Sequence, residues 1–186
     1  MPFMNTTYET DRLSLRICTK YDARLVLDFY KKNMEDFMKY EVIDPDVCRT
    51  LRFHENVLDA ETSMCSKGKM MRFYFFEKSN PLKIVGTFAF HDIQYMHHQC
   101  ARVGYKVGVN YRRKGYAKEA LKKGLEIVFN ELDIHRIEAF VLPDNAASIG
   151  LLESLGFIRE GLALDKYRIN GAWRDHYQYA RINSGQ

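Results

Sequence analysis

The stretch VNYRRKGYAKEAL, residues 109–121, joins an extended segment to a helix through three cations and one glycine. The glycine, Gly115, directly follows Arg112, Arg113 and Lys114. Glycine lets backbone N–H groups turn toward a ligand, and a helix N-terminus preceded by cations favours a negative ligand. The stretch therefore predicts an anion-binding turn at the start of a helix.

The segment after the turn has the clearest helical periodicity in the chain. Apolar residues recur at spacings of three and four, and Lys and Glu occupy the positions between them. We therefore expect an amphipathic helix with one face packed on a core and its charges in water. The apolar positions are Ala117, Ala120, Leu121, Gly124, Leu125 and Val128.

Three extended segments precede the turn, at residues 71–78, 82–93 and 101–110. A Ser-Asn-Pro turn separates the first two, and a polar stretch separates the second from the third. This order predicts an antiparallel meander. In the third segment Gly104 and Gly108 fall on the face opposite the valines, which suggests a bulge or the close approach of another molecule.

The remaining periodicity predicts a mixed α/β fold. Strands are expected at residues 8–18 and 135–142, and helices at 19–33, 47–67 and 143–157. The expected element order is β-α-α-β-β-β-α-β-α-β-β.

Local signals set the ends of the last elements. The final helix has Asp144 or Asn145 as its cap and stops at Gly156. Asn170-Gly171, flanked by Tyr, Ile and Trp, is the strongest short hairpin signal. We therefore expect the chain to finish in a two-stranded hairpin.

Length and composition limit the classes of protein. With 186 residues, the chain is expected to form a single domain over residues 1–186. The net charge of +4, without a run of five cations, gives no support for a nucleic-acid partner. No apolar stretch reaches about 18 residues and the N-terminus lacks a signal pattern, so we expect no membrane partner and a cytoplasmic location.

The cysteines and histidines do not form a metal-binding pattern. The four cysteines are scattered without CxxC spacing, so reduced thiols are expected. His97 and His98 lie close to Cys100, but no second ligand pair stands at metal spacing, so we expect no metal. The cysteines are Cys18, Cys48, Cys65 and Cys100.

Three phosphate-binding motifs compete for the cationic turn. A Walker A loop needs GxxxxGK followed by Ser or Thr, and the chain has none. A dinucleotide fingerprint needs GxGxxG, and the turn has one glycine. What remains is R-x-x-G-x-A, formed by Arg112, Gly115 and Ala117, between a strand and a helix.

This motif resembles the coenzyme A pyrophosphate loop of the GNAT acetyltransferases. The later stretch DNAASIGLLESLGFIREG is similar to that family's N-x-x-S…GF-x-x-EG segment. Together with NGAWRDHYQYARI, it resembles the branch of ribosomal-protein N-terminal acetyltransferases for alanine and serine. The resemblance covers nearly the whole chain and is strongest over residues 101–181. It implies an α/β fold with a central mixed, mostly antiparallel sheet flanked by helices.

The resemblance implies acetyl-CoA as the acetyl donor. Backbone N–H groups of residues 113–118 would cradle the pyrophosphate, with Gly115 leaving room for it. Residues 105–109 would pair with the pantetheine arm, and an N–H near Val107 would face the thioester carbonyl. The donor-binding residues expected in this way are Val107, Gly108, Val109, Arg112, Arg113, Lys114, Gly115, Tyr116, Ala117, Lys118, Asn145 and Ser148.

The implied reaction needs one proton donor and one base. A neutral amine attacks the thioester, and the CoA thiolate leaves. By resemblance Ser148 is the acid toward sulfur, and Asn145 positions the donor or the acceptor. The base stays open between His91, Tyr167 and a water chain. Tyr167 stands where the branch has a carboxylate, and Asp165 would share its strand face.

The acceptor also stays open. The branch implies the N-terminal α-amine of a ribosomal or other protein. The alternatives are a small amine, such as a polyamine, an aminoglycoside or an amino-acid derivative, and a CoA-binding module without catalysis. The acidic stretch at residues 33–46 could attract a cationic acceptor or be a solvated turn. The assembly is open between a monomer and a homodimer.

Overall fold

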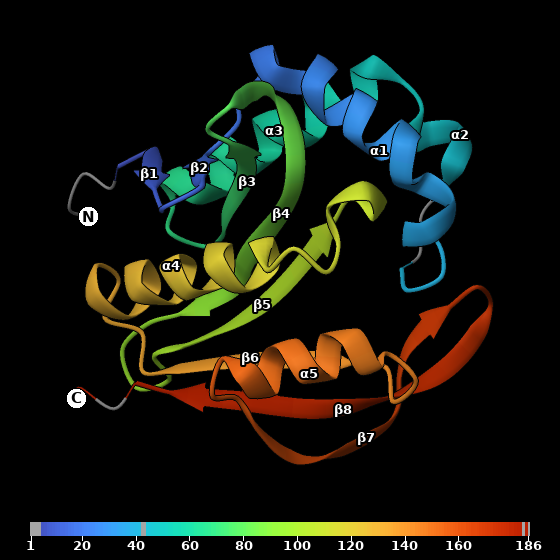
Figure 1. Ribbon diagram of the computed structural model, residues 1–186. Helices are drawn as coiled ribbons and strands as arrows, with labels where there is room; N and C mark the ends of the chain where they lie inside the picture. Colours follow the sequence, from blue (N-terminus) through green and yellow to red (C-terminus); the bar gives the residue numbers. More distant parts are fainter. Residues whose placement is uncertain (1–4, 42–43, 184, 186) are drawn as a thin grey trace.

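The structure is a computed structural model, and it describes residues 5–41, 44–183 and 185. Its centre is an eight-stranded sheet in the order β1-β2-β3-β4-β5-β6-β8-β7 (Figure 1). All neighbouring strands are antiparallel except β5 and β6, which are parallel. The expected class, a mixed and mostly antiparallel sheet flanked by helices, is confirmed. The strands are β1 (Thr7–Glu9), β2 (Leu13–Arg16), β3 (Met71–Glu77), β4 (Asn80–Gln94), β5 (Cys100–Val107), β6 (Arg136–Val141), β7 (Ile158–Ile169) and β8 (Ala172–Ile182).

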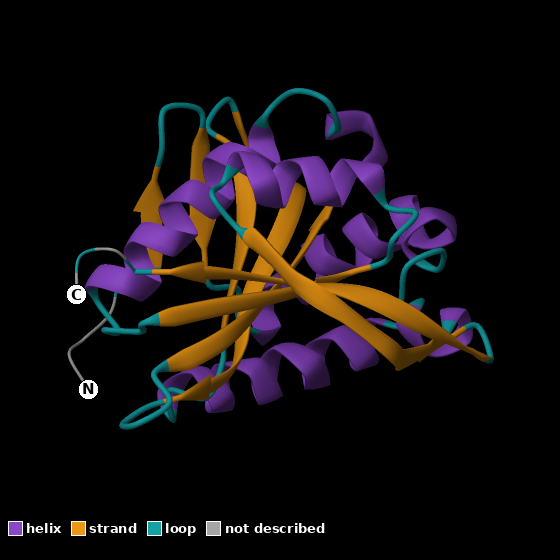
Figure 2. Cartoon of the chain, turned by 90° about the horizontal axis from the view of Figure 1, so that it is seen from below, coloured by secondary structure: helices purple, strands orange, loops and turns teal. Residues whose placement is uncertain are grey.

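Helices cover both faces of the sheet (Figure 2). The larger core, which includes Phe73, Phe88 and Leu121, lies under α4 and α5. The smaller core, which includes Phe29 and Leu58, lies under α1 and α3. The prediction that residues 1–186 form one domain stays a prediction, which the continuous sheet supports. The helices are η1 (Lys20–Asp22), α1 (Ala23–Phe37), α2 (Pro45–Cys48), α3 (Leu51–Ser66), η2 (Val109–Tyr111), α4 (Tyr116–Asn130) and α5 (Ala146–Ser154).

Two elements predicted as continuous are each divided. The strand expected at residues 8–18 is the hairpin of β1 and β2, because the Thr10 hydroxyl and the Leu13 backbone bond each other across a turn. The helix expected at residues 47–67 is α2 followed by α3. The Thr50 hydroxyl accepts the Phe53 N–H and starts a new helix there.

The sheet opens into a wedge between its two parallel strands. β5 and β6 pair only along Cys100–Arg102 and Arg136–Glu138, and then diverge toward their C-terminal ends (Figure 1). At Phe140 and Val141 the backbone of β6 therefore pairs with β8 on one side and has no β5 partner on the other. This wedge positions the candidate site, because the N-terminal ends of α4 and α5 both lie beside it.

The bulge suggested by the two glycines is wrong. β4 and β5 keep one continuous register from Gly86 opposite Val107 to His91 opposite Arg102. The Gly108 N–H donates to the Val85 carbonyl of β4 at 2.9 Å. Hydrogen-bonding direction alternates along an antiparallel pair, so the backbone N–H and carbonyl of Val107 point into the wedge. β5 ends at Val107, and Val109 belongs to η2 rather than to the strand.

The local predictions for the C-terminal half are confirmed. Asn145 caps α5 by accepting the Ser148 N–H. Gly156 follows α5 with a φ of +80°, and the Phe157 N–H returns to the Leu152 carbonyl. Asn170 and Gly171 both have positive φ and join β7 to β8.

Candidate active site

The cationic turn ends in an open helix N-terminus. Gly115 is the N-cap of α4 with a φ of +79°, a left-handed conformation that favours glycine. The first hydrogen bond of the helix runs from the Glu119 N–H to the Gly115 carbonyl. The N–H groups of Tyr116 to Lys118 have no intrahelical acceptor in such a helix. This end can therefore bind an anion through its backbone.

Arg12, from the β1–β2 turn, holds the cationic loop from behind. Its guanidinium donates to the Lys114 carbonyl at 3.0 Å and to the Glu119 carboxylate at 2.7 Å. It also stacks 4.5 Å from the centroid of the Tyr116 ring. Hydrogen bonds from Thr10 and Arg12 hold the pKa of Glu119 below its usual value despite burial, so this carboxylate stays charged. Arg12 therefore positions the backbone of the turn. The sequence did not suggest this role, because Arg12 lies far from the loop in the chain.

Replacing Arg12 tests this arrangement. We expect Arg12→Gln to raise the KM for acetyl-CoA about tenfold, since a partly exposed charged hydrogen bond contributes about 1.5 kcal/mol. The kcat at saturating acetyl-CoA should stay within about twofold. Initial rates over a range of acetyl-CoA concentrations measure both values. A change in kcat with an unchanged KM would contradict the positioning role.

The cations of the turn have different surroundings. The Arg112 guanidinium is paired with the Asp36 carboxylate of α1, so part of the acidic stretch serves this contact. Arg113 has a positive φ of 62° and is exposed. The Lys114 ammonium lies over the Tyr111 ring at 5.5 Å. Direct contacts of these three side chains with a ligand stay predictions.

Two clefts meet in the wedge. A cleft of about 380 Å³ lies against the turn and the starts of α4 and α5, and we call it the donor cleft. A second of about 530 Å³ borders β5, β6, β7 and β8, and we call it the acceptor cleft. The residues that border both clefts are Tyr40, Glu41, Tyr105, Asn145 and Ser148. A group held in one cleft can therefore react with a group held in the other.

Ser148 and Tyr105 form a hydrogen-bonded pair where the clefts meet. Their hydroxyl oxygens lie 2.6 Å apart, and Ser148 stands in the first turn of α5. Burial raises the pKa of Tyr105 to about 12, partly offset by the bond to Ser148, so Tyr105 keeps its proton at neutral pH. A Tyr105 hydroxyl that donates to the Ser148 oxygen leaves the serine hydrogen free to point into the wedge.

Asn145 has a structural task as well as its place in both clefts. Its Oδ1 accepts the Ser148 N–H at 3.1 Å, which orients the first turn of α5. It therefore positions Ser148 from the side of the helix cap. Contacts of Asn145 with a donor or an acceptor stay predictions.

The acceptor cleft has paired charges at its rim. The Lys106 ammonium bonds the Glu41 carboxylate at 2.6 Å and the Tyr30 hydroxyl at 2.9 Å. Arg102 contacts the Asp92 carboxylate at 3.1 Å and lies 3.8 Å from Glu138. Among the described residues that line this cleft, Glu41 is the only carboxylate, and its charge is compensated by Lys106.

The two predicted bases both line the acceptor cleft, in different settings. His91 is half-buried, and its Nδ1 lies 3.2 Å from an Asp92 carboxylate oxygen. Tyr167 packs edge-on against Phe140 at 6.1 Å, and burial raises the pKa of its phenol. A raised pKa makes the phenolate rarer, which disfavours Tyr167 as a base at neutral pH.

The expectation that Asp165 shares a strand face with Tyr167 is wrong. β7 is irregular between Ala163 and Tyr167, where three residues have no partner on β8 in the regular register. Asp165 has a φ of +46°, its side chain is exposed, and it is not among the residues that line the cleft. Period-two counting fails at a bulge because the extra residues turn the strand over.

One cleft residue was missed by sequence reasoning. His176 of β8 lines the acceptor cleft and is only 5% exposed. Its Nδ1 lies 3.0 Å from the Arg174 carbonyl, and its ring packs edge-on against Tyr167 with centroids 5.0 Å apart. From the sequence, strand alternation places His176 on the same face as Gln178. The sequence does not show that β8 lies beside β6, and this strand order puts that face next to the wedge.

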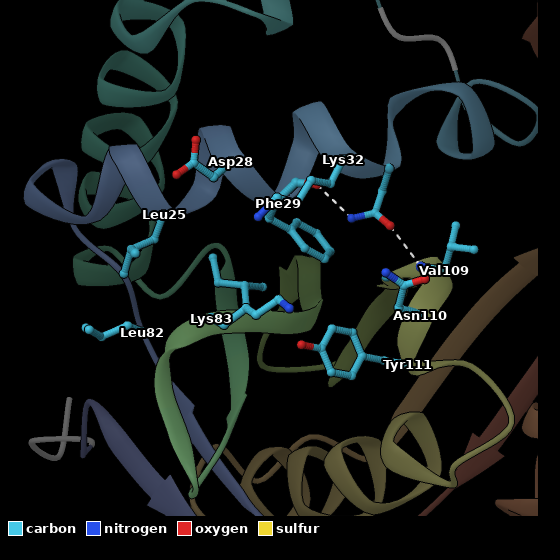
Figure 3. Close-up of a pocket in the computed structure, with 12 residues that line it drawn as sticks. Leu25, Asp28, Phe29, Lys32, Leu82, Lys83, Val109, Asn110 and Tyr111 are labelled. Atoms are coloured by element: carbon cyan, nitrogen blue, oxygen red, sulfur yellow. Dashed lines mark hydrogen bonds between the residues drawn. The ribbon is translucent and has the colours of Figure 1, made fainter.

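A third cavity, of about 440 Å³, lies between α1, the start of β4 and η2 (Figure 3). The buried Asn33 side chain spans its edge, donating to the Phe29 carbonyl and accepting the Val109 N–H. Tyr111 borders both this cavity and the donor cleft. Asn33 thus ties α1 to the segment that leads into the cationic turn.

The fold combines an open helix N-terminus with two connected clefts, an arrangement that suits a group-transfer enzyme. Residues 12–158 match the family model described as an acetyltransferase (GNAT) domain. The chain belongs to the GNAT acetyltransferase family and is an acyl-CoA-dependent acetyltransferase with acetyl-CoA as its donor. The resemblance seen in the sequence is confirmed at this level.

Similar proteins support the same family. The chain is 31% identical over 162 residues to a probable N-acetyltransferase, YjcK, from Bacillus subtilis, covering 87% of this chain and 89% of that one. It is 30% identical over 168 residues to the ribosomal protein uS5 alanine N-acetyltransferase of Escherichia coli, covering 90% and 86%. The solved ribosomal-protein-S5-alanine acetyltransferase from Vibrio fischeri superposes with a TM-score of 0.91 at 26% identity, covering 97% and 98%.

A shorter match concerns another acceptor. A spermidine N(1)-acetyltransferase from Vibrio cholerae is 27% identical over 92 residues, which cover 50% of this chain and 53% of that one.

Within residues 5–41, 44–183 and 185, no three His, Cys, Asp or Glu side chains are grouped to hold a metal ion. The described helices include none with the length and apolar character needed to cross a membrane.

Proposed function

We propose that this acetyltransferase modifies the N-terminal α-amine of a protein or peptide, by direct attack on acetyl-CoA in a ternary complex. The observation that carries the proposal is the junction of donor and acceptor clefts at Tyr105, Asn145 and Ser148. A ternary mechanism needs both substrates to reach one point from separate sides. The relatives named as ribosomal-protein N-acetyltransferases make a protein N-terminus the first acceptor class to test.

The charges of the acceptor cleft favour a monocationic acceptor over a polyamine. A polyamine carries several positive charges and needs unpaired carboxylates to bind them. The cleft offers Glu41, already paired with Lys106, whereas Arg102 and Arg168 also border it. A peptide N-terminus has a single amine, which is deprotonated when it reacts. Such an acceptor needs hydrogen-bonding partners for its peptide groups but no set of unpaired carboxylates. Small amines remain the alternative that the same assay separates.

The proposed reaction uses the residues at the junction. The acceptor nitrogen attacks the thioester carbonyl, the new C–N bond forms and the C–S bond breaks. The Val107 N–H, directed into the wedge, would stabilise the carbonyl oxygen as it becomes negative. Ser148, whose hydroxyl oxygen lies 2.6 Å from that of Tyr105, would give a proton to the departing sulfur, with Tyr105 then donating to the serine oxygen.

The test is release of free CoA thiol from acetyl-CoA with a panel of acceptors. The panel holds peptides with N-terminal Ala or Ser, the same peptides with blocked N-termini, spermidine and an aminoglycoside. We expect turnover with the free peptides, and mass spectrometry should locate the acetyl group on the α-amine. Acetylated spermidine without any modified peptide would contradict the acceptor. Acetyl-CoA binding without turnover across the panel would favour a CoA-binding module.

A variant at Gly104 separates the two clefts. Gly104 lines the acceptor cleft, and a Cβ built on it meets no atom within 4 Å. Gly104→Leu should therefore fill acceptor space and lower kcat/KM for the peptide by about tenfold or more, from a loss of about 1.4 kcal/mol of acceptor binding. Acetyl-CoA affinity, followed by calorimetry, should stay within about twofold. Equal losses for both substrates would show that the clefts are not separate.

A further inference from the structure

His176 stands on the acceptor side of the wedge. Its β8 register places it two residues from Gln178, which pairs with Phe140 of β6. His176 and Phe140 therefore point to the same face of the sheet, and both line the acceptor cleft. Ser148 belongs to α5, which covers the opposite face of the sheet. An amine that enters from the acceptor cleft would meet His176 on its own side and the donor thioester across the wedge.

The hydrogen bond of His176 defines which nitrogen carries its proton. A carbonyl oxygen only accepts, so the Nδ1 that bonds the Arg174 carbonyl at 3.0 Å must be the protonated nitrogen. Nε2 then holds the lone pair. The edge-on contact with Tyr167, at an interplanar angle of 85°, restricts rotation of the ring. Burial lowers the pKa of His176, so the imidazole is neutral at pH 7.

Charged groups around His176 partly cancel. Arg174 and Lys166 lower its pKa, and Asp175 raises it. The other titratable groups that line the same cleft come from four further parts of the chain. They are Tyr40, Glu41, His91, Arg102, Tyr105, Tyr167 and Arg168.

We propose that Nε2 of His176 is the general base that accepts the proton of the attacking amine. This inference rests on the proposed function, since it requires an amine acceptor in the cleft. As the C–N bond forms and the C–S bond breaks, the amine proton passes to Nε2. The sulfur receives the Ser148 proton on the other side of the wedge. Between turnovers the imidazolium returns its proton to water, and Ser148 regains a proton from water.

The other candidate bases are less suitable by position. His91 is half-buried, against 5% exposure for His176, and its Nδ1 contacts the exposed Asp92 carboxylate, so its ring is less shielded from water. Glu138 is held by Arg136 at 3.0 Å and does not line the cleft. His176 lines the cleft, is buried, and has a ring oriented by the Arg174 carbonyl and Tyr167; the hydrogen bonds among the described residues include none to its Nε2.

The test compares His176→Asn with a control at another buried histidine, His54. Asn keeps a donor close to the Nδ1 position but has no basic nitrogen. We expect kcat with the Ala or Ser peptide to fall about 100-fold or more, the contribution typical of a general base. The KM for acetyl-CoA should stay within about twofold. His54→Gln should keep kcat within about threefold, because His54 is a buried histidine of α3 that bonds the Cys48 carbonyl and lines neither cleft.

The pH profile distinguishes a base from a structural residue. The base works when neutral, and its pKa is lowered from 6.5, so wild-type kcat should be level above pH 6.5 and fall as the pH drops below that value. In His176→Asn this limb should vanish, and the residual rate should rise steadily with pH. Added imidazole should restore part of the rate in His176→Gly.

Two results would overturn the assignment. One is a kcat for His176→Asn within threefold of wild type. The other is a lower kcat with an unchanged pH profile and no rescue by imidazole, which indicates a structural role. Wild-type turnover of the peptides is measured first. Its absence would overturn the proposed function and the base together, whereas turnover that survives in His176→Asn would overturn the base alone.

Discussion

Gly115→Val should abolish productive acetyl-CoA binding while leaving the fold intact. The left-handed φ of +79° is costly for any residue with a Cβ, and most costly for a β-branched one. A Cβ on Gly115 would also lie 3.4 Å from the Arg12 guanidinium, and the larger valine side chain would press on the contact that holds the turn and its N–H groups in place. Losing two hydrogen bonds to a charged pyrophosphate, at about 1.5–3 kcal/mol each, should lower kcat/KM for acetyl-CoA by about 100-fold or more.

A matched variant separates strain from lost binding. Gly156 has a φ of +80°, lies at the C-terminal end of α5 and meets no neighbour closer than 4.0 Å through a built Cβ. Gly156→Val should therefore suffer the same backbone strain without touching the donor cleft. We expect the two variants to lose similar unfolding temperature and only Gly115→Val to lose acetyl-CoA affinity, measured by calorimetry. Equal affinities in both would remove the turn from the binding site.

Gly86→Ala should cost about 3 kcal/mol of unfolding free energy, at the upper end for overpacking. A Cβ on Gly86 would lie 2.2 Å from the Phe75 ring and 2.5 Å from the Lys106 carbonyl oxygen. Phe75 is buried in the larger core and the carbonyl belongs to β5, so neither can withdraw without moving a strand. For a chain of this length the loss corresponds to roughly 6–12 °C in Tm.

Gly104→Ala is the control for this prediction. Gly104 is paired in the same two strands, opposite Ala89, but its Cβ would enter open space. Its unfolding free energy should stay within about 0.5 kcal/mol of wild type. Chemical denaturation of both variants gives the comparison. A small loss for Gly86→Ala would mean that Phe75 can repack, and that the close approach of β3, β4 and β5 is not required.

The parts of the fold that were predicted correctly depend on neighbouring residues. The period of α4 follows from side chains three and four apart, and the hairpin after β7 follows from the φ > 0 preference of Asn170 and Gly171. The predictions that failed concern places where a turn or a bulge interrupts the local pattern. The Thr10 turn divides a strand of alternating apolar residues, and the bulge before Tyr167 breaks the count to Asp165.

By itself the sequence determined the class of element at nearly every position, the cationic turn with its glycine, and the family. Each of these is local, because backbone sterics, caps and periodicity act within a few residues. Only the tertiary structure determined which residues lie together around the two clefts. The wedge exists because β5 and β6 pair over three residues and then part. That parting brings Tyr105 to Ser148, and the strand order carries His176 to the acceptor cleft, through contacts between residues that no local rule connects.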